Sequence, residues 1–102
     1  MPTVLFVRIT TDLSADEIER RIDERRALFL EVPGLLQKIF GRDAETGDVC
    51  GVYFFENKTA LENYRASDLA QSIAQAYEAS SVRREVYEAF APLFEGRRPF
   101  NG

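Results

Sequence analysis

Two short runs of the sequence, residues 4–9 (VLFVRI) and residues 49–56 (VCGVYFFE), are apolar at nearly every position. Both are rich in β-branched and aromatic residues, which predicts two strands that are covered on both faces. A chain of 102 residues has room for one domain. Helices of such a domain cover one face of a small sheet, so something else has to cover the other face.

A first helix is predicted to begin at Ser14, because Ser14 and Glu17 have the spacing of a capping box. The helix should end near residue 31, before the Pro-Gly pair at 33–34. The remaining predicted elements are a strand at 35–42, a polar hairpin loop at 43–48, the strand at 49–56, a helical region from about residue 57 with an interruption at 67–68, and a strand at 82–91.

The predicted order is therefore β-α-β-β-α-β within a single domain of residues 1–102. Its core should span about residues 3–91, and residues 92–102 read as a loose tail. With right-handed crossovers, this order gives a ferredoxin-like α+β fold, a four-stranded antiparallel sheet with two main helices on one face. We expect a second copy of the sheet to cover the open face, which makes the protein a homodimer.

Composition narrows the function. Thirteen basic and seventeen acidic residues give a net charge of −4, which argues against a nucleic-acid partner. The arginine pairs at 20–21, 25–26 and 83–84 lie among acidic residues and are interpreted as solvated faces. The absence of histidine removes the commonest metal ligand and general base, so we expect no metal site.

The sequence features that bear on cellular location favour the cytoplasm. No apolar stretch approaches the roughly 20 residues that span a bilayer, and the N-terminal apolar run is too short for a signal peptide. Cys50 is the only cysteine, which fits a reducing compartment. With no histidine to activate it, Cys50 is not expected to act as a nucleophile. We therefore expect a cytoplasmic protein that binds no membrane.

Three parts of the chain resemble the YdhR-like mono-oxygenase family: residues 32–39 (VPGLLQKI), the Asp43 and Thr46-Gly47 positions, and residues 51–56 (GVYFFE). The wider group is the dimeric α+β barrel superfamily, which includes antibiotic-biosynthesis mono-oxygenases. The resemblance covers about residues 3–91. It implies two sheets packed face to face, with a pocket in each subunit between its own sheet and helices.

The resemblance also implies a function, a cofactor-independent mono-oxygenase that acts on a small aromatic or apolar compound. In such members the substrate itself activates dioxygen in a dry pocket, and no cofactor is required. Haem-degrading relatives use a histidine that this chain lacks. Some relatives have a pocket tryptophan, and the resemblance puts Phe55 in the equivalent place.

Strand alternation selects the candidate site residues. It places Phe6 and Arg8 on one side of the first strand, opposite Leu5, Val7 and Ile9. In the same way it groups Lys38 with Phe40, and Tyr53 with Phe55; family resemblance turns these sides toward the helices. The predicted catalytic residues are Arg8, Lys38 and Tyr53, with the two cations stabilising an anion. The predicted substrate-binding residues are Phe6, Phe40, Phe55, Tyr64 and Tyr77.

Several alternatives stay open at this point. Arg8 and Lys38 can instead extend to the sheet edge, and buried tyrosines commonly pack a core. Alternation does not match the sides of neighbouring strands, and a bulge at Gly51 would reverse the third strand. The alternatives in function are a related isomerase or cyclase, a non-catalytic small-ligand-binding protein on the same scaffold, and an interaction module without a pocket.

Overall fold

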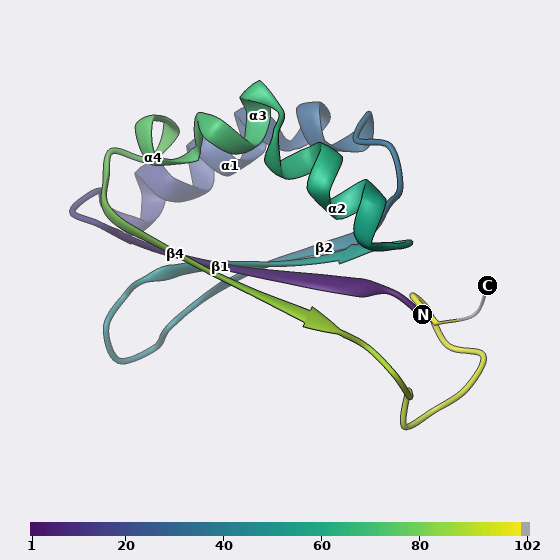
Figure 1. Cartoon of the computed structure of the whole chain (residues 1–102). Helices are drawn as coiled ribbons and strands as arrows, with labels where there is room; N and C mark the ends of the chain where they lie inside the picture. Colours follow the sequence, from purple (N-terminus) through teal and green to yellow (C-terminus); the bar gives the residue numbers. More distant parts are fainter. Residues whose placement is uncertain (101–102) are drawn as a thin grey trace.

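The structure, a computed structural model, describes residues 1–100. Its elements in chain order are β1 (Thr3–Thr11), α1 (Ala15–Leu30), β2 (Leu35–Arg42), β3 (Val49–Phe55), α2 (Lys58–Arg65), α3 (Asp68–Gln71), α4 (Ile73–Ala76) and β4 (Ala79–Glu88). The strands form one antiparallel sheet in the order β2-β3-β1-β4. All the helices lie on one face of this sheet (Figure 1). The predicted ferredoxin-like α+β fold is confirmed.

Side-chain caps explain where the helices begin. The Ser14 hydroxyl accepts a hydrogen bond of 3.2 Å from the Glu17 amide at the start of α1. Asn57 caps α2 in the same way, and Ser67 caps α3 by accepting from the Ala70 amide. The second helical region is therefore interrupted at the predicted position, Ser67, and a further break at Ser72 that was not predicted divides it into three short helices. Strand β4 begins three residues earlier than expected and also ends earlier, at Glu88.

The core lies between the sheet and the helices. Leu5, Val7 and Ile9 alternate as buried side chains on β1, and β3 contributes Tyr53 and Phe55. The register pairs Leu5 with Tyr53, so both side chains lie on the helix-covered face. Helix residues complete this core, among them Ile18, Phe29, Leu61, Tyr64, Ile73 and Tyr77.

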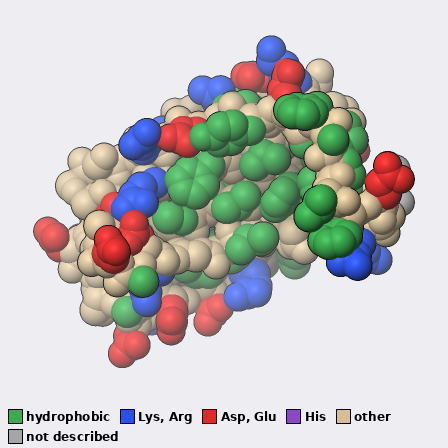
Figure 2. Space-filling view, turned by 90° about the horizontal axis from the view of Figure 1, so that it is seen from below, with side chains coloured by type: hydrophobic (Ala, Val, Ile, Leu, Met, Phe, Trp, Pro, Cys, Tyr) green, Lys and Arg blue, Asp and Glu red, His purple; other side chains and the backbone are tan. Residues whose placement is uncertain are grey.

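The other face of the sheet carries no helix and is largely apolar. In the register Val4 lies opposite Phe54 and Phe6 lies opposite Val52. Figure 2 shows apolar side chains gathered across the middle of this face, with charged side chains around its margin. We call it the open-face patch, made by Val4, Phe6, Ile39, Val52, Phe54 and Tyr87. Within residues 1–100 no helix is long and apolar enough to cross a membrane.

Candidate functional site

Arg8 and Phe6 lie on the open face of the sheet, so the prediction that they face the helices is wrong. The Arg8 Nε atom donates to Asp48 at 2.8 Å, and its Nη2 atom donates to Asp43 at 2.7 Å. Leu5 and Val7 occupy the helix side instead, where both are buried in the core. The guanidinium holds the pKa of the Asp43 carboxyl low, at about 2. Arg8 thus ties β1 to the loop between β2 and β3, away from any sheet–helix pocket.

Lys38 and Phe40 of β2 do face the helices, together with Tyr53 of β3. The register pairs Lys38 with Tyr53 and Phe40 with Gly51, and it runs without a shift through Gly51. The bulge lies earlier in β2, between Leu35 and Gln37. Strands β2 and β3 therefore present the predicted side chains to the interior, while β1 does not.

The Lys38 ammonium lies among aromatic rings. Its Nζ atom is 3.3 Å from the ring centre of Phe29 and 4.4 Å from those of Phe40 and Tyr53. Burial lowers the pKa of Lys38 to about 7, and the charge of Arg25 adds to this effect. The ring faces favour the charged form and act in the opposite direction. No carboxylate within residues 1–100 forms an ion pair with Lys38.

Two tyrosines form the centre of the interior. The hydroxyl oxygens of Tyr53 and Tyr64 lie 3.3 Å apart, and the ring centroids are 5.3 Å apart. Burial raises the pKa of both phenols, which keeps them neutral. Phe55 is fully buried and stacks on Tyr53, so it packs the core behind the two hydroxyls.

The space beside Lys38 is too small for an aromatic ligand. It has a volume of about 20 Å³ and lies among Phe40, Tyr53 and Tyr77. Such a volume holds about one water molecule. Arg25 lies over the Tyr77 ring at 5.7 Å. Four of the predicted site residues, Lys38, Phe40, Tyr53 and Tyr77, therefore meet in one place, but most of the room for a ligand lies elsewhere.

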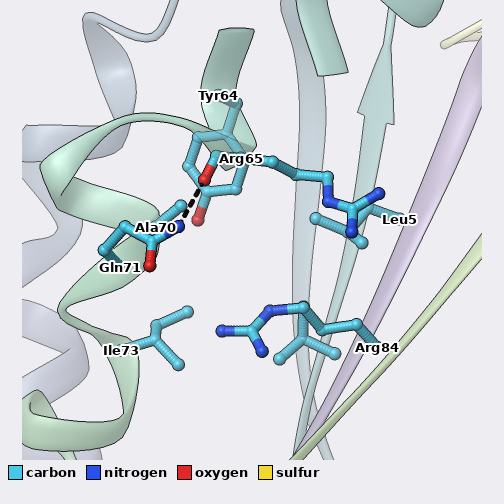
Figure 3. Close-up of a pocket in the computed structure, with 8 residues that line it drawn as sticks. Leu5, Tyr64, Arg65, Ala70, Gln71, Ile73 and Arg84 are labelled. Atoms are coloured by element: carbon cyan, nitrogen blue, oxygen red, sulfur yellow. Dashed lines mark hydrogen bonds between the residues drawn. The ribbon is translucent and has the colours of Figure 1, made fainter. Parts of the chain in front are cut away.

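A larger pocket opens on the other side of Tyr64, between strands β1 and β4 and helices α2 to α4. Its volume is about 150 Å³. Its apolar lining includes Leu5, Val7 and Ile73, and its polar lining includes Tyr64, Arg65, Gln71 and Arg84. In Figure 3 the Arg84 side chain reaches in from β4, and the Arg65 side chain approaches from the helix side. We call this hollow the Tyr64 pocket.

The two arginines of the Tyr64 pocket differ in how they are held. The Gln71 side-chain amide donates to the Arg65 carbonyl oxygen at 2.8 Å, which links α2 to α3 on the helix side of the pocket (Figure 3). The Arg65 guanidinium lies 3.8 Å from Glu62, the outer limit of an ion pair. Arg84 has no ion-pair partner within residues 1–100. The rim therefore has positive charge available for an anion.

Sequence reasoning missed Arg65, Gln71 and Arg84. Arg84 pairs with Val7 in the register, so it faces the helices, while its neighbour Arg83 faces away. The signal was the parity of β4, because Val82, Arg84 and Val86 share one side of that strand. The mixed polarity of this edge strand hides the signal, because Arg83 and Arg84 lie among acidic residues in the sequence and so resemble a solvated face.

Metal-binding groups are not gathered in the described part of the chain. Residues 1–100 bring no three histidine, cysteine, aspartate or glutamate side chains together as a metal site. Cys50 is a free, half-buried thiol on the open side of β3, and burial raises its pKa. The chemistry that the Tyr64 pocket offers comes from phenol, guanidinium and amide groups.

The four-stranded sheet, with helices on one face and a pocket between the two, places the protein among ferredoxin-like α+β proteins. The model of the family described as "Putative mono-oxygenase ydhR" matches residues 4–97. The chain belongs to this family. A comparison with curated proteins gave no match.

Solved structures share the fold. SnoaB, a cofactor-independent oxygenase from Streptomyces nogalater, superposes with a TM-score of 0.72 at 20% identity, covering 93% of this chain and 100% of that one. Rv0793 from Mycobacterium tuberculosis gives 0.72 at 15% identity, covering 92% and 100%. A dimeric ferredoxin-like protein of unknown function from Thermobifida fusca gives 0.66 at 13% identity, covering 86% and 92%. At these identities the similarity concerns the fold alone.

Proposed function

We propose that this protein is a cofactor-independent mono-oxygenase that binds a one-ring phenol or hydroquinone in the Tyr64 pocket. The observation that carries the proposal is the pocket itself, about 150 Å³, with apolar side chains on part of its wall and a phenol, an amide and two guanidinium groups on the rest. An apolar cavity of about this volume in another protein binds benzene. Membership of a mono-oxygenase family and the fold shared with a cofactor-independent oxygenase support the reaction type.

The charges of the pocket suit the first step of such a reaction. Arg84 and Arg65 favour the phenolate of a bound hydroquinone, because a nearby cation lowers the pKa of an acidic group. The phenolate is the form that transfers an electron to dioxygen. A carbon–oxygen bond then forms, the O–O bond breaks, and the second oxygen atom leaves as water. Hydroquinone and O₂ give hydroxybenzoquinone and H₂O, and the substrate supplies all four electrons.

Tyr64 is the phenol that meets the substrate in this proposal, and Tyr53 acts through it. Tyr64 lines the pocket, whereas Tyr53 is only 1% exposed and lies behind it. The contact between the two hydroxyls fixes the direction of the Tyr64 hydroxyl. Tyr53 is thus a positioning residue. Lys38 is not among the residues that line the Tyr64 pocket and has no direct contact with this substrate.

We also propose that two copies pack through the open-face patch as a homodimer. The patch is apolar, lies opposite the helices and includes Ile39, which is 52% exposed. Contiguous apolar patches of this kind mark interaction surfaces. A related fold from Thermobifida fusca is described as dimeric. In this arrangement Phe6 contributes to the interface, and Arg8 holds the neighbouring loop.

Oxygen uptake tests the proposed function. We expect uptake with hydroquinone and methylhydroquinone and less with anthrone, whose three rings exceed the pocket. Arg84→Gln should reduce kcat/KM by about tenfold, the size of one lost charged hydrogen bond. Arg83→Gln is the matched control, because Arg83 lies on the same strand but on the opposite face. Equal oxygen uptake by the Arg84→Gln and Arg83→Gln variants would show that the reaction does not take place in the Tyr64 pocket.

Binding without uptake would favour the alternative, a non-catalytic small-ligand-binding protein. In that case NMR titration with hydroquinone should shift the Leu5 and Val7 methyl signals while oxygen stays constant. A protein that neither binds nor oxidises these compounds would overturn both functions.

A further inference from the structure

A second hollow lies on the opposite side of the molecule from the Tyr64 pocket, between the end of α1 and the edge strand β2. Its volume is about 270 Å³, larger than that of the Tyr64 pocket. Leucines supply much of its wall. Its lining includes Arg26 and Leu30 from α1, and Leu35, Leu36, Lys38 and Phe40 from β2. We call it the Lys38 groove; its lining residues differ from those of the Tyr64 pocket.

The groove presents apolar side chains to solvent. Leu30 is 79% exposed and Leu36 is 47% exposed, although both border a core that buries most large apolar residues. They lie on adjacent elements, the last turn of α1 and the start of β2. Strand β2 is an edge of the sheet, so no further strand covers this side within residues 1–100. An apolar ligand body would remove these leucines from water.

Lys38 supplies the charge of the groove. Its ammonium is held by the Phe29, Phe40 and Tyr53 rings and has no carboxylate partner within residues 1–100. A cation in such a partly dry place is stabilised by an anion that shares its surroundings. Arg26 adds a second positive charge at the groove, with only a 3.3 Å contact to the exposed Asp23.

Arg25 lies near Lys38 but does not line the groove. Its Nη2 atom donates to the Ser72 hydroxyl at 3.4 Å, and its Nε atom is buried with no hydrogen-bond partner within residues 1–100. The charge of Arg25 acts on Lys38 and contributes to lowering its pKa. Neither Lys38 nor the half-buried Arg25 forms an ion pair with a carboxylate among the described residues, so the positive charge beside the groove is not balanced there.

We propose that the Lys38 groove binds an aliphatic monocarboxylate, with the carboxylate on the Lys38 ammonium and the chain along Leu30, Leu35 and Leu36. The aliphatic class follows from the walls, since leucines line the groove and the aromatic faces are occupied by the ammonium. If about 150 Å³ holds the six carbons of benzene, about 270 Å³ holds roughly ten non-hydrogen atoms. Octanoate has that size.

Methyl NMR on the full chain tests the proposal directly. Titration with octanoate at pH 6, below its micelle concentration, should shift the methyl signals of Leu30, Leu35 and Leu36. Octanol has the same chain without the charge and should bind at least about tenfold more weakly, the worth of one charged contact. Equal binding of octanol and octanoate would overturn the proposal, and this comparison requires no variant.

Substitutions at Lys38 test whether the octanoate carboxylate binds to the Lys38 ammonium. Lys38→Met should weaken octanoate binding by about tenfold or more, and Lys38→Gln gives the same result if the first variant folds poorly. Lys58→Met is the matched control, an exposed lysine at the start of α2. Unchanged affinity in both Lys38 variants would contradict the assignment, as would shifts confined to Leu5 and Val7 in the Tyr64 pocket.

The Lys38 groove is separate from the Tyr64 pocket, so the two proposals can be tested independently. Arg84→Gln should bind octanoate as tightly as the parent protein does, because Arg84 lies in the Tyr64 pocket. Conversely, Leu30→Glu, which places a negative charge in the groove far from Tyr53 and Tyr64, should abolish octanoate binding and leave oxygen uptake with hydroquinone within about twofold of the parent. If no oxygen uptake is found, the octanoate titration still tests the Lys38 groove. If octanoate does not bind, oxygen uptake still tests the Tyr64 pocket.

Discussion

The Lys38 Nζ atom lies 3.3 Å from the centre of the Phe29 ring, joining the edge strand β2 to helix α1 through a cation and an aromatic face. This contact closes the side of the core that faces the Lys38 groove. It also places a charge where burial disfavours it, since the pKa of Lys38 is lowered from 10.5 to about 7. Fold stability at this site is therefore linked to pH.

The first prediction concerns that linkage. Between about pH 7 and pH 10.5 the unfolded chain binds a proton at Lys38 that the folded chain has lost, so this group makes stability rise with pH. Lys38→Met removes the effect. At pH 6 the variant should be more stable than the parent by about 1–2 kcal/mol, after allowance for the lost ring contacts. The difference should shrink by pH 9.5.

Urea unfolding at the two pH values measures this, with Lys58→Met as the control that should show no pH-dependent difference. A variant that is less stable than the parent at pH 6 would mean that the aromatic faces outweigh the cost of burial. Lys38 would then be a plain cation–π contact with an ordinary affinity for its proton.

The second prediction concerns the start of α1. Ser14→Ala removes the acceptor of the Glu17 amide and should lower the free energy of unfolding by about 1 kcal/mol. Ser81→Ala is a suitable control, because Ser81 is exposed on β4. Thermal or urea midpoints compare the variants. Coincident midpoints with equal slopes for Ser14→Ala and the parent would show that the cap is energetically silent.

The third prediction concerns assembly through the open-face patch. Sedimentation equilibrium should give a homodimer at micromolar concentration, with an interface above roughly 1,200 Å². Ile39→Glu places a charge in the patch and should produce monomers. Leu28→Glu, at an exposed position of α1, should leave the dimer intact. A monomeric parent protein, or a dimer that tolerates Ile39→Glu, would rule out this interface.

The faces of the strands show what the sequence could predict and what it could not. Alternation separated Leu5, Val7 and Ile9 from Phe6 and Arg8, but both sides of β1 are apolar, so hydrophobicity did not choose between them. The choice depends on Asp43 and Asp48, which reach Arg8 only once the β1–β3 register is formed. The same kind of long-range pairing, with Val7, turns Arg84 toward the helices.

Local signals fared better, because they depend on neighbours in the chain. The caps at Ser14 and Asn57, the break at Ser67 and the bounds of β2 follow from a few adjacent residues each. The order of elements then leaves few topologies, and the ferredoxin-like sheet is the one observed. Pocket volume has no such local signal, since it depends on how α2 to α4 settle over β1 and β4.

The last prediction separates Tyr64 from Tyr53 in the proposed reaction. Tyr64→Phe removes the hydroxyl that faces the pocket and should raise KM and lower kcat for hydroquinone. Tyr53→Phe keeps that hydroxyl but removes its partner 3.3 Å away, so kcat should fall several-fold while KM changes little. It should also cost about 1 kcal/mol of stability, because the Tyr64 hydroxyl loses a buried hydrogen bond. Phe55→Leu, a change in the same aromatic cluster that removes neither hydroxyl, serves as the control: its unfolding midpoint should fall while kcat holds. If Tyr53→Phe and Phe55→Leu lower kcat equally, Tyr53 only supports the core and does not position Tyr64.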